Sequence, residues 1–285
     1  MNEHLVEPEA RPRRPGPTVR TRVTEHTDDL ERDREDRLAT EEPLEIRLTS
    51  PGSPAQRVWV TMRTPGHDFE LAAGFCCHEA IAAPTAIKGI AYCTDVDLTP
   101  EQEFNVVTVT LDAPADIGHR HTGMSAGSSA CGVCGKDSVT AVLDVARSGL
   151  VVPRWTGPLP SPAVVRRLPE SLREGQAVFS RTGGVHAAGL FTAEGERLLV
   201  REDVGRHNAV DKVTGARVMA GLSPAEACLV VSGRAGFELV QKAVAAGIGC
   251  LVAVGAPTSL AVSLAREAGL GLFGFTSADR TVRYS

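Results

Sequence analysis

The sequence predicts an α/β protein, α+β overall, in which a small β-rich N-terminal lobe precedes a three-layer α/β lobe. Its 285 residues are enough for two lobes, each with its own apolar core. In the C-terminal third, short apolar runs recur at intervals of about twenty residues, with amphipathic helical patterns between them. In the first half, the two-residue alternation of strands dominates instead.

Residues 1–40 combine four prolines and charges of both signs with almost no apolar residues. Such a composition buries too little surface to offset the entropy of the chain, so we expect a disordered charged tail. Its arginines favour RNA, but in the run 31–37 opposite charges alternate and nearly cancel. A solvated tail is therefore the preferred interpretation.

Residues 41–117 form the predicted N-terminal lobe. Strands are expected at 43–49, 56–62 and 104–111. Apolar residues spaced by three and four positions predict a helix over 67–81, after the turn Thr64-Pro65-Gly66. Cys76 and Cys77 fall on this helix, where neighbouring side chains point to different faces, so we expect core packing rather than a shared metal.

Residues 118–135 are rich in Gly, Ser and His and hold hardly any residue that would anchor them to a core, so we expect a mobile loop. The loop ends in Cys131-Gly132-Val133-Cys134-Gly135. A helix is expected directly after it, over 136–146. Another is expected to begin at Ser161-Pro162, an N-cap followed by proline at the first helical position.

Residues 136–285 form the predicted C-terminal lobe. Strands are expected at 228–231, 250–254 and 270–275, and helices at 237–246 and 259–268. Strands that alternate with helices need crossover connections, which predicts a largely parallel sheet covered on both faces. Each strand ends in a loop of small residues, and in such sheets ligands bind outside the carboxyl ends of the strands.

Composition and charge exclude several classes of function. The net charge of −5 and the pI near 5.9 give no overall positive field for nucleic acid or an anionic membrane. No stretch is apolar enough to span a bilayer, and the charged N-terminus lacks the apolar core of a signal peptide, so we expect a cytoplasmic protein. The seven cysteines, spread over a long chain, are expected to be free thiols.

The motif Cys131-Gly132-Val133-Cys134 points to sulfur chemistry, because a following helix start favours the reactive thiolate. Three interpretations compete: a persulfide carrier, a dithiol redox centre of thioredoxin type, and half of a zinc site. Zinc would need two more ligands, and only His119 and His121 lie nearby. A thioredoxin motif would directly follow a strand. A mobile arm suits delivery of sulfur better than it suits electron exchange.

Two polar clusters lie further along the chain. Residues 179–190 bracket His186 with glycines, where a histidine is usually a hydrogen-bonded part of the structure. Ala188 stands where a zinc-dependent base deaminase needs a glutamate, so deamination is not expected. In 201–212, Asp203 can cap a helix and His207 can pair with Asp211. This cluster fits a capped, solvated helix start and a ligand contact equally well.

Together these motifs resemble the formate dehydrogenase accessory sulfurtransferase family, FdhD, from about residue 41 to the end. The resemblance rests on Glu42-Pro43-Leu44, residues 62–68, residues 131–135 and residues 201–212, in the same order along the chain. The long charged tail and Phe75-Cys76-Cys77-His78 depart from the family pattern.

The resemblance implies a function and a site. Members of that family take sulfur from a cysteine desulfurase and pass it to molybdenum bis(molybdopterin guanine dinucleotide), bound as a substrate, before it enters formate dehydrogenase. By motif, we expect Cys131 to carry the persulfide and Cys134 to assist it. The expected cofactor-binding residues are Phe275, Thr276, Ser277, Ala278, Asp279 and Arg280. The resemblance also implies a homodimer and a C-terminal lobe with the cytidine deaminase fold without zinc.

A rival hypothesis from another class is a non-catalytic, zinc-stabilised chaperone for formate dehydrogenase. It predicts about one zinc ion per chain. The sulfurtransferase hypothesis predicts no metal bound directly by the protein and no nucleic acid or membrane partner.

Overall fold

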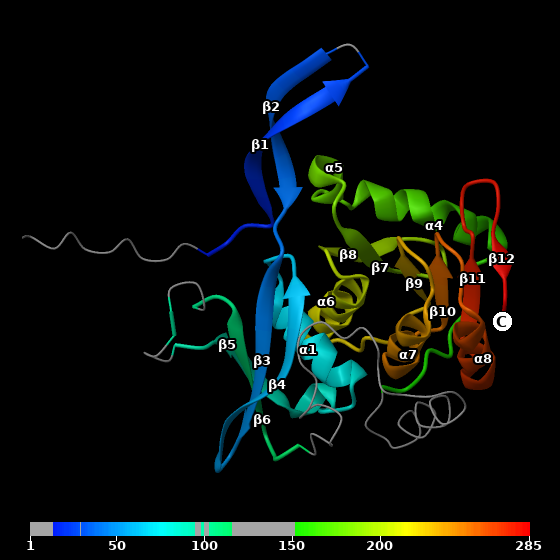
Figure 1. Cartoon of the computed structure of the whole chain (residues 1–285). Helices are drawn as coiled ribbons and strands as arrows, with labels where there is room; N and C mark the ends of the chain where they lie inside the picture. Colours follow the sequence, from blue (N-terminus) through cyan, green and yellow to red (C-terminus); the bar gives the residue numbers. More distant parts are fainter. Residues whose placement is uncertain (1–13, 29, 95–97, 100–102, 116–151) are drawn as a thin grey trace, which may run out of the picture.

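The computed structural model describes residues 14–28, 30–94, 98–99, 103–115 and 152–285. Two lobes lie side by side, and a β-hairpin stands out from them (Figure 1). The predicted boundaries at 117–118 and 135–136 and the helix predicted at 136–146 lie outside the described residues. Within the described residues, no helix is long and apolar enough to cross a membrane.

The N-terminal lobe is a four-stranded sheet with one helix packed on it (Figure 1). In spatial order the strands are β4 (Ser53–Arg63), β3 (Glu42–Ser50), β6 (Val106–Leu111) and β5 (Ile87–Tyr92). β3 pairs antiparallel with β4 and parallel with β6, and β5 is antiparallel to β6. The helix is α1 (Asp68–His78), and a 3₁₀ turn (Pro84–Ala86) precedes β5. The three predicted strands and the predicted helix are confirmed; β5 was not predicted.

The core of this lobe follows from the alternation along β3. Leu44, Ile46 and Leu48 point inward and are buried, and they pack with Leu71 and Phe75 of α1. The apolar stripe of the helix thus covers one face of the sheet.

β1 (Thr18–Thr27) and β2 (Leu30–Ala39) form an antiparallel hairpin, so the predicted disorder of residues 1–40 is wrong for these two strands. Residues 1–13 lie outside the described part of the chain. The charges that cancel along the sequence meet across the strands, as in the contact of 3.0 Å between Arg20 and Glu35. The few apolar side chains share one face, which composition alone does not reveal: Val19, Val23, Leu30 and Leu38.

The C-terminal lobe is built on a six-stranded sheet. In spatial order the strands are β12 (Val282–Arg283), β11 (Gly271–Gly274), β10 (Cys250–Ala253), β9 (Cys228–Val231), β7 (His186–Phe191) and β8 (Arg197–Asp203). In this sheet β9, β10 and β11 pair parallel with one another, and β7, β8 and β12 pair antiparallel with their neighbours. The prediction of a largely parallel sheet is therefore wrong at the flanks, because β7 and β8 are joined by a tight turn at Gly195 instead of a helix.

Helices cover both faces of this sheet, which gives the three layers that the sequence predicts (Figure 1). Val165, Leu168 and Leu172 of α4 (Pro162–Glu174) pack on one face. The other face is covered by α6 (Arg206–Met219), α7 (Phe237–Ala245) and α8 (Ser259–Ala268). A one-turn helix, α5 (Phe179–Thr182), precedes β7. The predicted helices in this lobe are confirmed wherever the chain is described; the likeness to the cytidine deaminase fold stays a prediction.

The two lobes meet where α1 crosses α6. A Cβ atom on Gly74 of α1 would lie 1.9 Å from the carbonyl oxygen of Asp211, and one on Gly215 of α6 would lie 1.7 Å from that of Glu70. The backbones therefore touch at two points one helical turn apart, which only glycine permits. This contact fixes the orientation of the lobes.

Candidate functional site

The carboxyl edge of the C-terminal sheet gathers the features expected of a ligand site. The parallel strands β9, β10 and β11 all end there, and β8 runs in the same direction. The helices α6, α7 and α8 begin at this edge, directly after Gly205, Gly236 and Thr258. Their N-termini carry the partial positive charge of the helix dipole, which favours an anion.

The six predicted cofactor-binding residues, 275–280, form one turn at this edge. Phe275 adopts a left-handed conformation (φ 50°) and is 44% exposed. The guanidinium of Arg280 lies 5.3 Å from the centre of its ring. Thr276 is buried, and its N–H donates to the carbonyl of Ala253 at 3.2 Å, which ties the turn to β10. The remaining members, Ser277, Ala278 and Asp279, are exposed. Their role in binding stays a prediction.

His186 opens β7 at the same edge, opposite Asp203 of β8. Its ring lies beside Gly233, where a Cβ atom would be 3.5 Å from Nδ1. Burial, and then the nearby charges of Arg206 and His207, lower the pKa of His186. The lowered pKa favours the neutral form of the His186 imidazole at neutral pH, beside the guanidinium of Arg206.

The predicted pairing of His207 with Asp211 is wrong. Nε2 of His207 lies 2.6 Å from Oε2 of Glu238 on α7. Asp211 instead faces the lobe junction, where its Oδ1 lies 2.5 Å from Nδ1 of His78 and accepts from Nζ of Lys242 at 2.8 Å. Periodicity placed His207 and Asp211 one turn apart, but the elements packed around α6 draw the two side chains to different partners.

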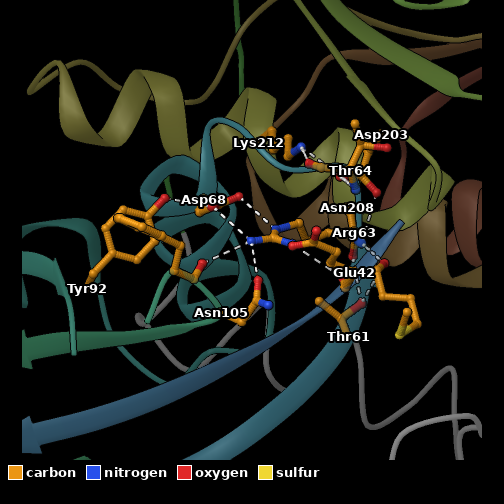
Figure 2. Close-up of polar contacts among 12 residues, drawn as sticks. Glu42, Thr61, Arg63, Thr64, Asp68, Tyr92, Asn105, Asp203, Asn208 and Lys212 are labelled. Carbon is orange, nitrogen blue, oxygen red and sulfur yellow. Dashed lines mark hydrogen bonds and ion pairs between the residues drawn. The ribbon is translucent and has the colours of Figure 1, made fainter. Parts of the chain in front are cut away.

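Asp203 is not the predicted N-cap, since that position is taken by Gly205 without a side-chain cap. Instead, Asp203 is completely buried at the lobe junction (Figure 2). Its Oδ1 accepts from the N–H of Gly205 at 2.8 Å and from Asn208 at 3.1 Å. Its Oδ2 accepts from the N–H of Thr64 at 3.1 Å and lies 2.7 Å from Nζ of Lys212. The carboxylate thus ties the turn after β4 to the start of α6.

A second buried ion pair, between Arg63 and Asp68, lies beside this junction within the N-terminal lobe (Figure 2). The Nε of Arg63 donates to Asp68 at 3.0 Å, and its Nη2 donates to Oδ1 of Asn105 at 2.9 Å. The other carboxylate oxygen of Asp68 accepts from the hydroxyl of Tyr92 at 2.7 Å. Burial and the contact with Asp68 raise the pKa of Tyr92. The sequence indicated the segments 62–68 and 201–212 separately, but not that they bind each other through Thr64, Asp203 and Lys212. The signal in the sequence was a dense run of charges beside small residues.

The structure describes five of the seven cysteines, and all five are free and buried: Cys76, Cys77, Cys93, Cys228 and Cys250. Burial raises the pKa of Cys76 and of Cys228, and it raises the pKa of Cys77 to about 12. The predicted catalytic residues Cys131 and Cys134 lie outside the described residues. Among the residues that are described, no group of three or more His, Cys, Asp or Glu side chains is arranged to hold a metal ion.

Comparison with known proteins shows the family to which the chain belongs. The model of the FdhD/NarQ family matches residues 39–285. The chain belongs to this family. It is 48% identical over 270 residues to the sulfur carrier protein FdhD of Nocardia farcinica, covering 94% of this chain and 93% of that protein. The sulfur carrier protein FdhD of Mycobacterium tuberculosis is 44% identical over 270 residues, with 92% and 94% covered.

A solved structure supports the fold. The chain superposes with a TM-score of 0.70 on a protein from Desulfotalea psychrophila described as a formate dehydrogenase accessory protein, covering 94% of this chain and 96% of that one at 21% identity. The FdhD/NarQ match begins at Ala39, the last residue of β2, and includes both motif cysteines and the turn 275–280. The hairpin therefore lies almost wholly before the matched region.

Proposed function

We propose that this protein is a sulfur carrier and sulfurtransferase for formate dehydrogenase. It accepts persulfide sulfur from a cysteine desulfurase and passes it to molybdenum bis(molybdopterin guanine dinucleotide) before that cofactor is inserted. The observation that carries the proposal is the similarity over nearly the whole chain to relatives named sulfur carrier protein FdhD, with 48% identity to one of them. The family resemblance also supports a cytoplasmic homodimer.

The environment of the described cysteines supports Cys131 and Cys134 as the reacting pair. Attack on sulfur needs a thiolate, and a buried thiol with a raised pKa remains protonated at neutral pH. Cys76, Cys77 and Cys228 are in that state. The motif cysteines lie within the family match, which covers residues 39–285.

The proposed transfer balances when the second cysteine supplies the electron pair. The desulfurase leaves an outer sulfur on Cys131 as a persulfide. The thiolate of Cys134 attacks the inner sulfur, a disulfide forms between the two cysteines, and the outer sulfur leaves as hydrosulfide. With one proton, hydrosulfide replaces an oxygen on the substrate cofactor, which leaves as water. A cellular thiol then reduces the disulfide.

The carboxyl edge of the C-terminal sheet is the proposed place for the guanine dinucleotide part of the cofactor. The exposed ring of Phe275 offers a stacking surface, and Arg280 offers a charge-assisted contact to phosphate. Three helix N-termini at the same edge favour negative charge. This local positive potential offsets the net charge of −5 that would otherwise repel the ligand.

Activation of the client enzyme tests this function. Apo formate dehydrogenase is matured in cells that lack the native carrier and express either the wild-type protein or Cys131→Ala. We expect Cys131→Ala to give only the activity seen without any carrier, with an unchanged melting temperature. The matched control Cys77→Ala removes a buried thiol and should retain activation. Full activation by Cys131→Ala would refute the proposal.

A further inference from the structure

The carboxyl edge carries a group of side chains that the proposed function leaves unused. His186, Arg206 and His207 gather at its far end, by β7 and β8, away from the turn 275–280. They come from two elements, a strand that starts at this edge and a helix that starts there.

The position of His186 is set by the sheet. It is the first residue of β7, and the chain beyond β9 passes close to its ring at Gly233. The neighbouring Ser232 accepts the N–H of Ala187 at 2.9 Å, which holds the start of β7 against the end of β9. The imidazole is half-buried at the rim of the edge.

The charges around His186 sum to a positive surplus. Asp203 of β8 faces it but is engaged with Lys212 at 2.7 Å. Glu238 of α7 lies 2.6 Å from His207. The loop after β9 adds Arg234, which is exposed, and α6 adds Arg206. An anion placed here would meet the exposed guanidinium groups of Arg206 and Arg234.

The length of the edge matches an extended nucleotide. The end of β11, where Phe275 begins, and the start of β7 are separated by β10 and β9. Three strand spacings amount to about 14 Å. A ligand whose base stacks on Phe275 would therefore carry its phosphates along the edge toward His186.

We propose that His186, together with Arg206, binds a phosphate oxyanion of the ligand and takes up a proton as it does so. This inference rests on the proposed function, since it assumes that a nucleotide-bearing cofactor occupies the edge. In the free protein, burial and the adjacent cations hold the pKa of His186 below its ordinary value of 6.5. A bound anion reverses the sign of the local potential and raises that pKa, so binding and protonation favour each other.

The test uses the full chain with ¹³C-labelled histidine side chains, and GDP as the probe. NMR titration should show the His186 pKa rising by about one unit when GDP is bound, which corresponds to about a tenfold coupling. Pyrophosphate should produce the shift and guanosine should not, because the phosphate is the group recognised. An equal shift with guanosine would overturn the inference.

Variants distinguish a failure of this inference from a failure of the proposed cofactor site. GDP affinity of the wild type should rise more steeply as pH falls through the region of 6.5 than that of His186→Asn, since protonation of the phosphate itself affects both equally. His26→Asn, on the exposed hairpin, should behave as wild type. If GDP binds and weakens in Arg280→Ala while His186→Asn keeps the wild-type pH slope, this inference fails and the cofactor site stands. If GDP does not bind the wild type, both fail.

Discussion

At the scale of single residues, the buried charges of the lobe junction come as pairs. Arg63 is matched with Asp68, Lys212 with Asp203, and Lys242 with Asp211. Removing one member of such a pair leaves an uncompensated charge and costs about 3–5 kcal/mol, although the intact pair adds little net stability. Each pair lies within one lobe, and the lobes are joined by further contacts of its members, as when Asp203 accepts from Thr64. In the same way, Asp211 contacts His78 across the junction.

Glu70 gives this junction a dependence on pH. Burial alone would raise its pKa, but hydrogen bonds from Arg201 and His67 lower it from 4.5 to about 2. A carboxylate with a lowered pKa contributes stability that is fully present above 4.5 and is lost as pH falls toward 2. We expect Glu70→Gln to be less stable than wild type at pH 7, with the difference shrinking below pH 4.5.

Chemical denaturation at pH 7 and pH 3 measures that difference. The matched control Glu174→Gln removes an exposed ion pair with Arg197, which contributes little at any pH. A difference between wild type and Glu70→Gln that is the same at both pH values would show that the carboxylate is not held as the structure indicates.

At the scale of elements, the crossing of α1 and α6 is the contact that joins the lobes. Gly215→Ala would place a methyl group 1.7 Å from the carbonyl oxygen of Glu70, so the helices must separate. We expect a loss of unfolding free energy of about 1–3 kcal/mol or more, even though alanine favours helix by about 1 kcal/mol. Gly89→Ala, which meets open space on β5, is the control and should cost far less. Equal melting temperatures for wild type and Gly215→Ala would contradict the close contact.

Most elements of the C-terminal lobe were predictable because their apolar patterns are local. The strand 228–231 and the helix 259–268 were predicted with the bounds that the structure shows. The hairpin of β1 and β2 was missed because its support comes from pairing across strands, which composition cannot express. The antiparallel β7 and β8 were missed because their turn looks like any other small-residue loop.

The candidate site was predictable only in part, because some of its contacts join residues that are far apart along the chain. The turn 275–280 follows a strand, so the edge of the sheet could be inferred from sequence order. The roles of Asp203 and Asp211 could not, because their partners Thr64 and His78 lie more than a hundred residues away along the chain. Local pairing rules assigned them to neighbours on α6, and long-range packing overrode those rules.

At the scale of the whole molecule, two fixed lobes present one ligand edge at the carboxyl ends of β9, β10 and β11. The chain returns from the motif-bearing segment near the opposite edge, where the N–H of Trp155 donates to the carbonyl of Gly247 at 2.7 Å, just ahead of β10. With α1 and α6 in backbone contact, we do not expect the lobes to hinge apart during sulfur transfer. Delivery of sulfur then depends on the motif cysteines.

The most direct test of this account is to find which cysteine carries sulfur. The full chain is incubated with a cysteine desulfurase and cysteine, and its intact mass and thiol-blocked peptides are measured by mass spectrometry. The account predicts one added sulfur atom on Cys131 and none in Cys131→Ala, since the buried thiols of Cys76, Cys77 and Cys228 stay protonated and enclosed. Sulfur added to a buried cysteine, or to Cys131→Ala as readily as to wild type, would contradict it.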